Sequence, residues 1–94
     1  MFIILLSYKK PLDIIDKFLV EHRAFLDDCY KKNLLLASGP RNPRTGGVII
    51  SQLSEKQQLL ELIEQDPFII NDLVDYEIID FSPVKYHPVL HQWC

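Results

Sequence analysis

The chain has 94 residues, 48% of them hydrophobic and 24% charged, with a formal net charge of −3 and a pI near 5.5. This length fits one globular domain, and no apolar run approaches the roughly 20 residues that span a bilayer. The acidic balance argues against nucleic acid as a partner, because phosphate binding needs a clustered cationic surface. Two cysteines cannot form a disulfide framework, so we expect a reducing, cytoplasmic location.

The first half of the chain shows the pattern of a strand, a helix and a second strand. Residues 2–6 (FIILL) form a continuous apolar run of strand length. Apolar residues then recur at three- and four-residue steps, which predicts one long helix over 11–33. Residues 34–37 (LLLA) predict a second strand, closed by Ser38-Gly39-Pro40, and the segment 41–47 (RNPRTGG) predicts a hairpin loop.

The second half repeats this order. Residues 48–50 (VII) predict a third strand, 54–64 a second helix, and Asp66-Pro67 the start of a short turn or helix. Residues 74–81 alternate between apolar and polar and predict a half-buried strand. The order β-α-β-β-α-β is that of a ferredoxin-like split βαβ unit, an α+β fold with an antiparallel sheet. We assign this domain to residues 1–83 and treat 84–94 as a C-terminal tail.

The two central strands of that fold, residues 2–6 and 48–50, are apolar at every position. Both faces of these strands therefore need burial, although the helices of this topology cover only one face. A chain of this length has no second layer to cover the other face. The pattern predicts a homodimer, with a second copy packed sheet against sheet.

His22 is the unusual residue of the first predicted helix. It lies four residues after Phe18 and four before Leu26, within the apolar stripe. Such a histidine needs partners for its ring nitrogens, because a buried unpaired polar group costs about 1–3 kcal/mol. It is either a structural residue satisfied by the protein or an acid–base group at the edge of a pocket, and the pattern leaves both open.

Asp66 stands directly before Pro67. This pair matches a helix N-cap followed by the first helical position, where the carboxylate accepts from backbone amides and the proline needs no donor. Capping is the simpler interpretation of these residues. A capping carboxylate can still accept a hydrogen bond from a histidine and fix its tautomer, so the structural and chemical roles are compatible.

Three segments together resemble the YciI-like (YCII-related) family: EHRAFLDDCYKKNLLLASGP (21–40), a glycine-containing hairpin, and DPFIIND (66–72). The resemblance covers residues 2 to about 83 and implies the ferredoxin-like homodimer of the dimeric α/β-barrel group. Members share a helix histidine and the aspartate of Asp-Pro-Phe as an active-site pair. The resemblance therefore implies that His22 and Asp66 are the catalytic residues.

The resemblance also implies a ligand cleft at the end of the second strand. Gly39 and Pro40 match the family's Gly-Pro, and the expected lining also includes Tyr8, Ser38 and Phe68. Members often carry an arginine shortly before the helix histidine and an apolar residue after it. Here those places hold Leu19-Val20-Glu21 and Arg23. Arg41 and Arg44 of the hairpin are then the candidate cations for substrate binding, and the alternative is that both are solvated loop charges.

The function that the resemblance implies is acid–base catalysis on a small molecule. Asp66 would orient His22, which would move a proton on or off the ligand in an elimination, isomerisation or hydrolysis that uses no cofactor. The alternative is a non-catalytic dimeric module that binds a metabolite or a protein, and a purely structural subunit would have no pocket at all. A catalytic histidine leaves one ring nitrogen facing an open pocket, whereas a structural histidine has both nitrogens capped.

The tail contains His87, His91 and Cys94, residue types that bind zinc. No fourth ligand is evident, and Leu90 and Trp93 indicate packing instead, so we expect no metal site. The chain has no GxGxxG, P-loop, CxxC or GxSxG motif. Dinucleotide, nucleotide, thiol-redox and serine-hydrolase functions therefore have no support.

Overall fold

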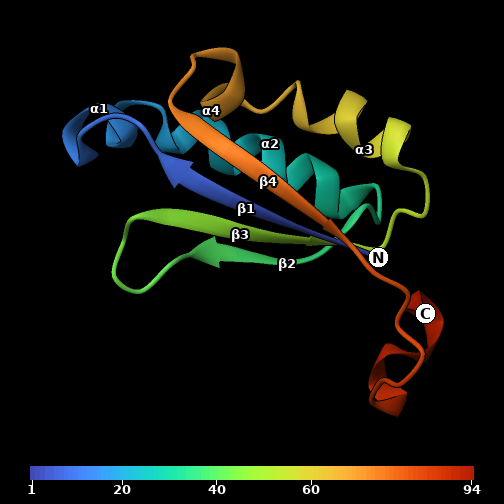
Figure 1. The fold of residues 1–94 in the computed structure, drawn as a ribbon. Helices are drawn as coiled ribbons and strands as arrows, with labels where there is room; N and C mark the ends of the chain where they lie inside the picture. Colours follow the sequence, from blue (N-terminus) through green and yellow to red (C-terminus); the bar gives the residue numbers. More distant parts are fainter.

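The computed structural model describes residues 1–94 and has four strands. The elements in chain order are β1 (Phe2–Tyr8), α1 (Leu12–Lys17), α2 (Leu19–Lys31), β2 (Leu35–Pro40), β3 (Gly46–Ser51), α3 (Lys56–Ile63), α4 (Pro67–Ile70), β4 (Val74–Asp80) and the 3₁₀ helix η1 (Pro88–Trp93). The strands form one antiparallel sheet in the order β2-β3-β1-β4. Helices α1 to α4 lie on one side of it (Figure 1). The predicted α+β, ferredoxin-like fold is confirmed, with β1 and β3 in the centre.

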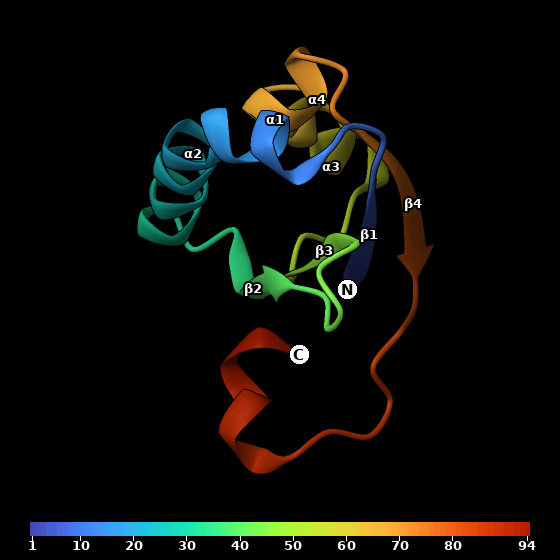
Figure 2. The ribbon, with the colours of Figure 1, turned by 90° about the vertical axis from the view of Figure 1, so that its left-hand side faces the viewer.

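The side chains of β1 alternate between the two faces of the sheet. Phe2, Ile4 and Leu6 are at most 2% exposed and form the middle of the core beneath the helices. Ile3 and Leu5 point to the opposite face, which no helix covers (Figure 2), and are partly exposed. We call this surface the open face; its apolar residues, placed by the strand register, are Ile3, Leu5, Val48, Ile50 and Ile79.

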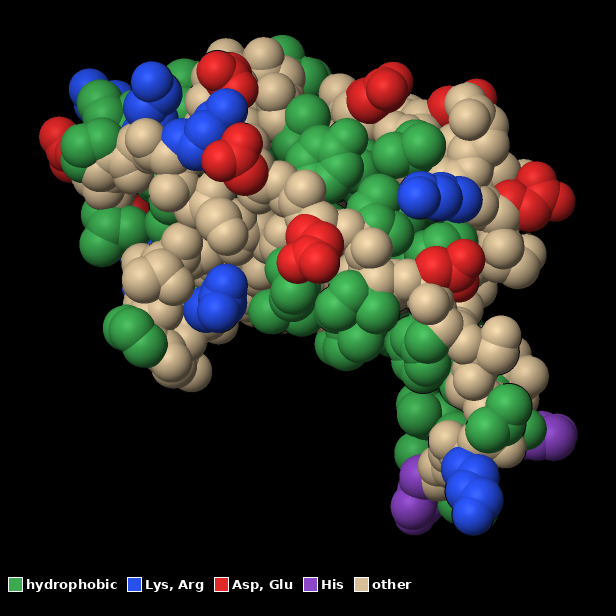
Figure 3. Space-filling model, in the orientation of Figure 1, with side chains coloured by type: hydrophobic (Ala, Val, Ile, Leu, Met, Phe, Trp, Pro, Cys, Tyr) green, Lys and Arg blue, Asp and Glu red, His purple; other side chains and the backbone are tan.

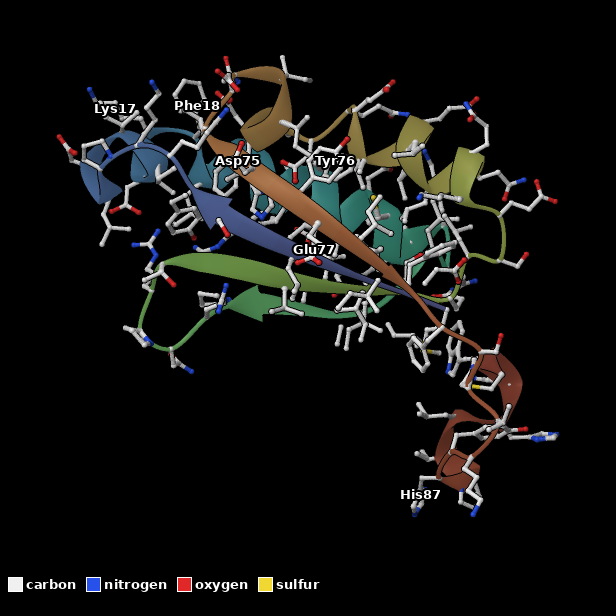
Figure 4. The ribbon with its side chains drawn as sticks, in the orientation of Figure 1. Lys17, Phe18, Asp75, Tyr76, Glu77 and His87 are labelled. Atoms are coloured by element: carbon white, nitrogen blue, oxygen red, sulfur yellow. The ribbon has the colours of Figure 1, made fainter.

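The prediction of one helix over 11–33 is wrong in one respect, because this segment forms two helices, α1 and α2. Phe18 lies between α1 and α2 with φ −108° and ψ 2°, outside the helical region. Its carbonyl accepts from the amide of His22, so the second helix starts again from this residue. Lys17 and Phe18 mark the junction in Figure 4. Neither proline nor glycine announces this break in the sequence.

The hairpin between β2 and β3 is shorter than predicted. Ser38, Gly39 and Pro40 were expected to end the strand but pair with β3 instead. Pro40 is tolerated because β2 is an edge strand, where a missing amide donor breaks no ladder. Gly46, expected in the turn, lies in β3, and a Cβ there would sit 1.8 Å from the carbonyl oxygen of Leu6. The close approach of β1 and β3 therefore requires glycine at this position.

Beyond β4 the chain leaves the body of the domain. Residues 84–94, which we call the arm, contain η1 and project on the side of the sheet opposite the helices (Figures 1 and 2). Pro88 is the first residue of η1, and the side chain of His87 accepts from the amide of Val89. No helix of the structure combines the length and the apolar character needed to cross a membrane.

Candidate active site

Asp66 is held at the start of α4 by local structure. Its backbone is extended, Pro67 occupies the first helical position, and Oδ1 accepts from the amide of Phe68 at 2.9 Å. The capping interpretation is therefore confirmed. The side chain is only 1% exposed, so the cap lies inside the domain.

The same carboxylate reaches His22 on α2, 44 residues away in sequence. Nδ1 of His22 lies 2.7 Å from Oδ1 of Asp66. An ionised carboxylate only accepts, so Nδ1 carries the hydrogen and donates it. Oδ1 thus takes two hydrogen bonds, whereas Oδ2 is buried and has none. A buried carboxylate oxygen without a donor is unfavourable, and Gln52 Oε1 is the other buried side-chain oxygen in this state.

The plane of the His22 ring is fixed by aromatic packing. The rings of His22 and Phe68 stack with centroids 3.9 Å apart and an interplanar angle of 3°. Tyr8 meets Phe68 edge to face at 6.2 Å. Nε2 of His22 makes no hydrogen bond with the protein and retains contact with solvent. One ring nitrogen is therefore capped and the other is open.

A cavity of about 590 Å³ lies beside this histidine. Its walls come from β1, α2, β2, the hairpin, β3 and α4. Its lining residues include His22 and the predicted Tyr8, Ser38, Gly39, Pro40 and Phe68. Asp66 lies behind His22 and does not line the cavity. Of the two hairpin arginines, Arg44 lines it and Arg41 does not.

Sequence reasoning missed Tyr30 as a member of this cavity. Its hydroxyl lies 2.7 Å from Oγ of Ser38, and both residues line the wall formed by α2 and β2. Tyr30 falls within the helix predicted over 11–33, and the apolar spacing of that helix alone does not mark it as a cavity residue. It comes eight residues after His22, about two turns along the same side, and this spacing is the signal that could have identified it.

Two arginines line the cavity in different states. Arg44 pairs with Asp16, and its guanidinium lies 5.9 Å from the centroid of the Tyr8 ring. The hydrogen bond with Asp16 is the main cause that raises the pKa of Arg44 above its ordinary value. Arg23 directly follows His22 and forms no ion pair. The unpaired cation of the cavity is therefore Arg23, at the position where the family pattern suggested an apolar residue.

The zinc-capable residues of the arm do not come together. No group of three or more His, Cys, Asp or Glu side chains is arranged to hold a metal ion. His87 lies at the far end of the arm, away from the cavity (Figure 4).

The family model of the YCII-related domain matches residues 1–82. The chain belongs to the YCII-related domain family. The resemblance read from the segments around His22 and Asp66 is thereby confirmed, and it spans all four strands of the sheet. No curated protein sequence matches the chain.

Among solved structures, the chain is similar to 5-chloro-2-hydroxyhydroquinone dehydrochlorinase (TftG) from Burkholderia phenoliruptrix AC1100, in complex with 2,5-dihydroxybenzoquinone. The TM-score is 0.71 and the sequence identity 18%, and the match covers 87% of this chain and 94% of that chain. A likeness at this level of identity establishes a shared fold.

Proposed function

We propose that this YCII-related protein is a small-molecule enzyme in which His22 and Asp66 act as an acid–base pair. The observation that carries the proposal is the unequal state of the two ring nitrogens of His22. Nδ1 is bonded to Asp66, whereas Nε2 has no protein partner beside a cavity of about 590 Å³. A histidine kept only for stability would have both nitrogens satisfied.

The roles of the two residues follow from this geometry. With the hydrogen on Nδ1, the lone pair of Nε2 is available to take a proton from a ligand in the cavity. The Asp66 carboxylate then faces the positive charge that forms on the ring. Phe68 keeps the imidazole plane fixed while the proton moves, and Nε2 returns the proton at a second atom or to a leaving group. This sequence serves an elimination, an isomerisation or a hydrolysis and uses no redox cofactor.

The cavity suits a small ring compound with oxygen substituents. Leu19, Leu26 and Ile49 supply apolar wall, while Arg23 and the hydroxyls of Tyr30 and Ser38 supply polar groups. This mixture is typical of metabolite pockets. The structurally similar dehydrochlorinase binds a dihydroxybenzoquinone, which supports a planar oxygenated ligand. Its name denotes loss of HCl, an elimination, and this supports elimination among the three reaction classes.

The test is turnover of chlorinated hydroxyhydroquinones, followed by chloride release, and of a panel of hydroxylated aromatic acids and lactones. His22→Gln removes the base, and His91→Gln on the arm is the matched control because His91 is exposed. We expect kcat/KM to fall at least about 100-fold in the first variant and to be unchanged in the second. Full turnover by His22→Gln would contradict the proposal. If the wild type binds these compounds without turning any of them over, the result would favour the non-catalytic module.

We further propose that the protein acts as a homodimer through its open face. Five apolar side chains occupy this face without a covering helix, and a shallow hollow of about 260 Å³ lies over β2 and β3, lined in part by Ala37, Gly39, Val48 and Ile50. A second copy placed on the same surface by a two-fold axis buries both faces at once. The hollow provides room for side chains of that copy.

The oligomeric state is tested by light scattering or sedimentation at micromolar concentration. Ile79→Glu places a charge on the open face at a residue that is 40% exposed, and Ile70→Glu on α4, at 65% exposed, is the matched control. We expect the wild type and Ile70→Glu to be dimeric and Ile79→Glu to be monomeric. A monomeric wild type would contradict the proposed homodimer.

A further inference from the structure

We propose that the arm, residues 84–94, packs against a second copy of this chain and not against its own domain. The inference rests on the homodimer proposed above and goes beyond it, because the open face alone is sufficient for a sheet-to-sheet dimer. It assigns a role to the one segment that neither the active site nor the predicted domain uses.

The first observation is the state of the arm itself. Val84 and Val89 are 87% and 72% exposed, and Tyr86 is 40% exposed. The arm nevertheless has a defined conformation, since Pro88 begins η1 and His87 caps it. A six-residue 3₁₀ helix is not stable in water by itself. Its order therefore needs a surface to pack on, and its apolar side chains are available for that contact.

The second observation is that no hydrogen bond or ion pair ties the arm to its own domain, and only Leu90 and Trp93 among its large apolar side chains are half-buried within the single chain. The hydrogen bonds of the arm, such as that from the amide of Cys94 to the carbonyl of Leu90, all stay within the arm. No ion pair joins it to the rest of the chain. In the space-filling view the arm projects from the domain, and the surface between the arm and the sheet is concave (Figure 3).

The third observation is the direction in which the arm projects. It leaves the end of β4 on the side opposite the helices, which is the side of the open face (Figures 1 and 2). A second copy stacked on the open face therefore lies beside the arm. Because a two-fold axis relates the copies, each arm would contact the other copy in the same way.

The charges of the arm and of the open face also favour a second copy of the chain as the partner. The charged side chains that β4 places on the open face are Asp75 and Glu77 (Figure 4); Asp75 pairs with Lys9, whereas Glu77 forms no ion pair. The only Lys or Arg of the arm is Lys85, which forms no ion pair. A second copy thus presents the unpaired carboxylate of Glu77 to an arm that brings an unpaired cation. The exposed valines and this lysine together fit the open-face side of another copy of the chain.

Trp93, the only tryptophan of the chain, lies in the arm and reports directly on its contacts. We expect its emission to be blue-shifted and poorly quenched by acrylamide at concentrations where the protein is dimeric. On dilution to monomer the emission should shift to the red and acrylamide quenching should increase, as expected for the half-buried Trp93 of the single chain. The full-length double variant Val84→Asp/Val89→Asp should raise the dimer Kd at least about tenfold and expose Trp93. The matched control is His91→Asn/Gln92→Asn, which changes two exposed polar residues of the same arm without adding charge and should keep wild-type values.

The outcomes separate this inference from the homodimer on which it rests. A wild-type Kd and wild-type quenching in Val84→Asp/Val89→Asp would overturn the role of the arm and leave the dimer intact. Shielded Trp93 in the monomeric Ile79→Glu variant would show that the arm packs on its own domain, which also overturns the inference. A wild type that is monomeric at all concentrations would overturn both. Far-UV circular dichroism checks that each variant keeps its fold.

Discussion

The two faces of the sheet bury apolar side chains in different ways. On the helix face, Phe2, Ile4 and Leu6 are closed over completely by elements of the same chain. On the open face, the intervening residues Ile3 and Leu5 remain partly exposed. The apolar run 2–6 therefore contributes fully buried side chains to the core on one face and partly exposed side chains to the other face. The helix face can fix polar groups inside the domain, whereas the open face offers mainly apolar contact to another molecule.

The helix face also shows how a structural polar group differs from a candidate catalytic one. Ser51 is fully buried, and its hydroxyl donates to the carbonyl of Leu34 and accepts from the amide of Leu53. Its hydrogen-bonding capacity is used by the backbone. His22 and Asp66 are buried as well, but Nε2 of the one and Oδ2 of the other have no protein partner. Gln52 Oε1 is also buried without a partner, but only the His22–Asp66 pair combines such an oxygen with a ring nitrogen beside the cavity.

The sharpest test of the two faces uses neighbouring isoleucines of β1. Ile4→Ala should lower the free energy of unfolding by about 2–5 kcal/mol, because it leaves a cavity in a closed core. The loss should not depend on protein concentration. Ile3→Ala should cost the protomer less, and its effect should grow where the dimer forms. Urea unfolding at two protein concentrations measures both. Equal, concentration-independent losses would show that the open face is not an interface.

The two cysteines extend the comparison to reactivity. Cys29 is 1% exposed on the helix side, and burial raises the pKa of its thiol to about 11, whereas Cys94 ends the arm and is exposed. At pH 8 the buried thiol has far less thiolate, so it should react with a disulfide reagent at least roughly 100 times more slowly. Its rate should rise as the pH approaches 11. Cys94→Ser identifies the fast thiol, and two equal rates would contradict the assignment.

The acid–base pair is tested for its structural contribution by substitutions of Asp66. Asp66→Ala removes the cap of α4 and the partner of Nδ1, and should lower stability by about 2 kcal/mol. Asp66→Asn should cost less, because its amide oxygen can still accept from Phe68. Asp66→Ala should release the fixed tautomer of His22, which long-range ¹H–¹⁵N NMR reads directly, whereas the amide oxygen of Asp66→Asn can still accept from Nδ1. An unchanged Nδ1–H signal in Asp66→Ala would mean that Asp66 does not orient the ring.

Much of this architecture could be predicted from the sequence because it depends on local patterns. The apolar runs predicted the central strands, and the pair Asp66-Pro67 predicted the N-cap of α4. The contact between His22 and Asp66 joins residues 44 positions apart; the residue pattern allowed it, and family resemblance suggested it. The contact between Tyr30 and Ser38 depends on how α2 packs over β2. Which of the two hairpin arginines lines the cavity depends on the path of the hairpin. Such contacts have no periodicity that a sequence displays.

Removal of an exposed ion pair at the border of the sheet should give the smallest effect on stability. Lys9 at the end of β1 pairs with Asp72, and this hydrogen bond is the main cause that lowers the pKa of Asp72 below its ordinary value. A lowered carboxyl pKa adds stability above about pH 4, and the stability is lost as the pH falls through the lowered value. Asp72 has φ 55°, a left-handed conformation that asparagine also tolerates, so Asp72→Asn removes only the charge. Thermal unfolding should show a slight loss at pH 7 that disappears in high salt and in acid, because the pair is exposed and screened. Asp80→Asn, at an exposed residue outside any ion pair, is the control, and a loss from Asp72→Asn that persisted in high salt would contradict an electrostatic origin.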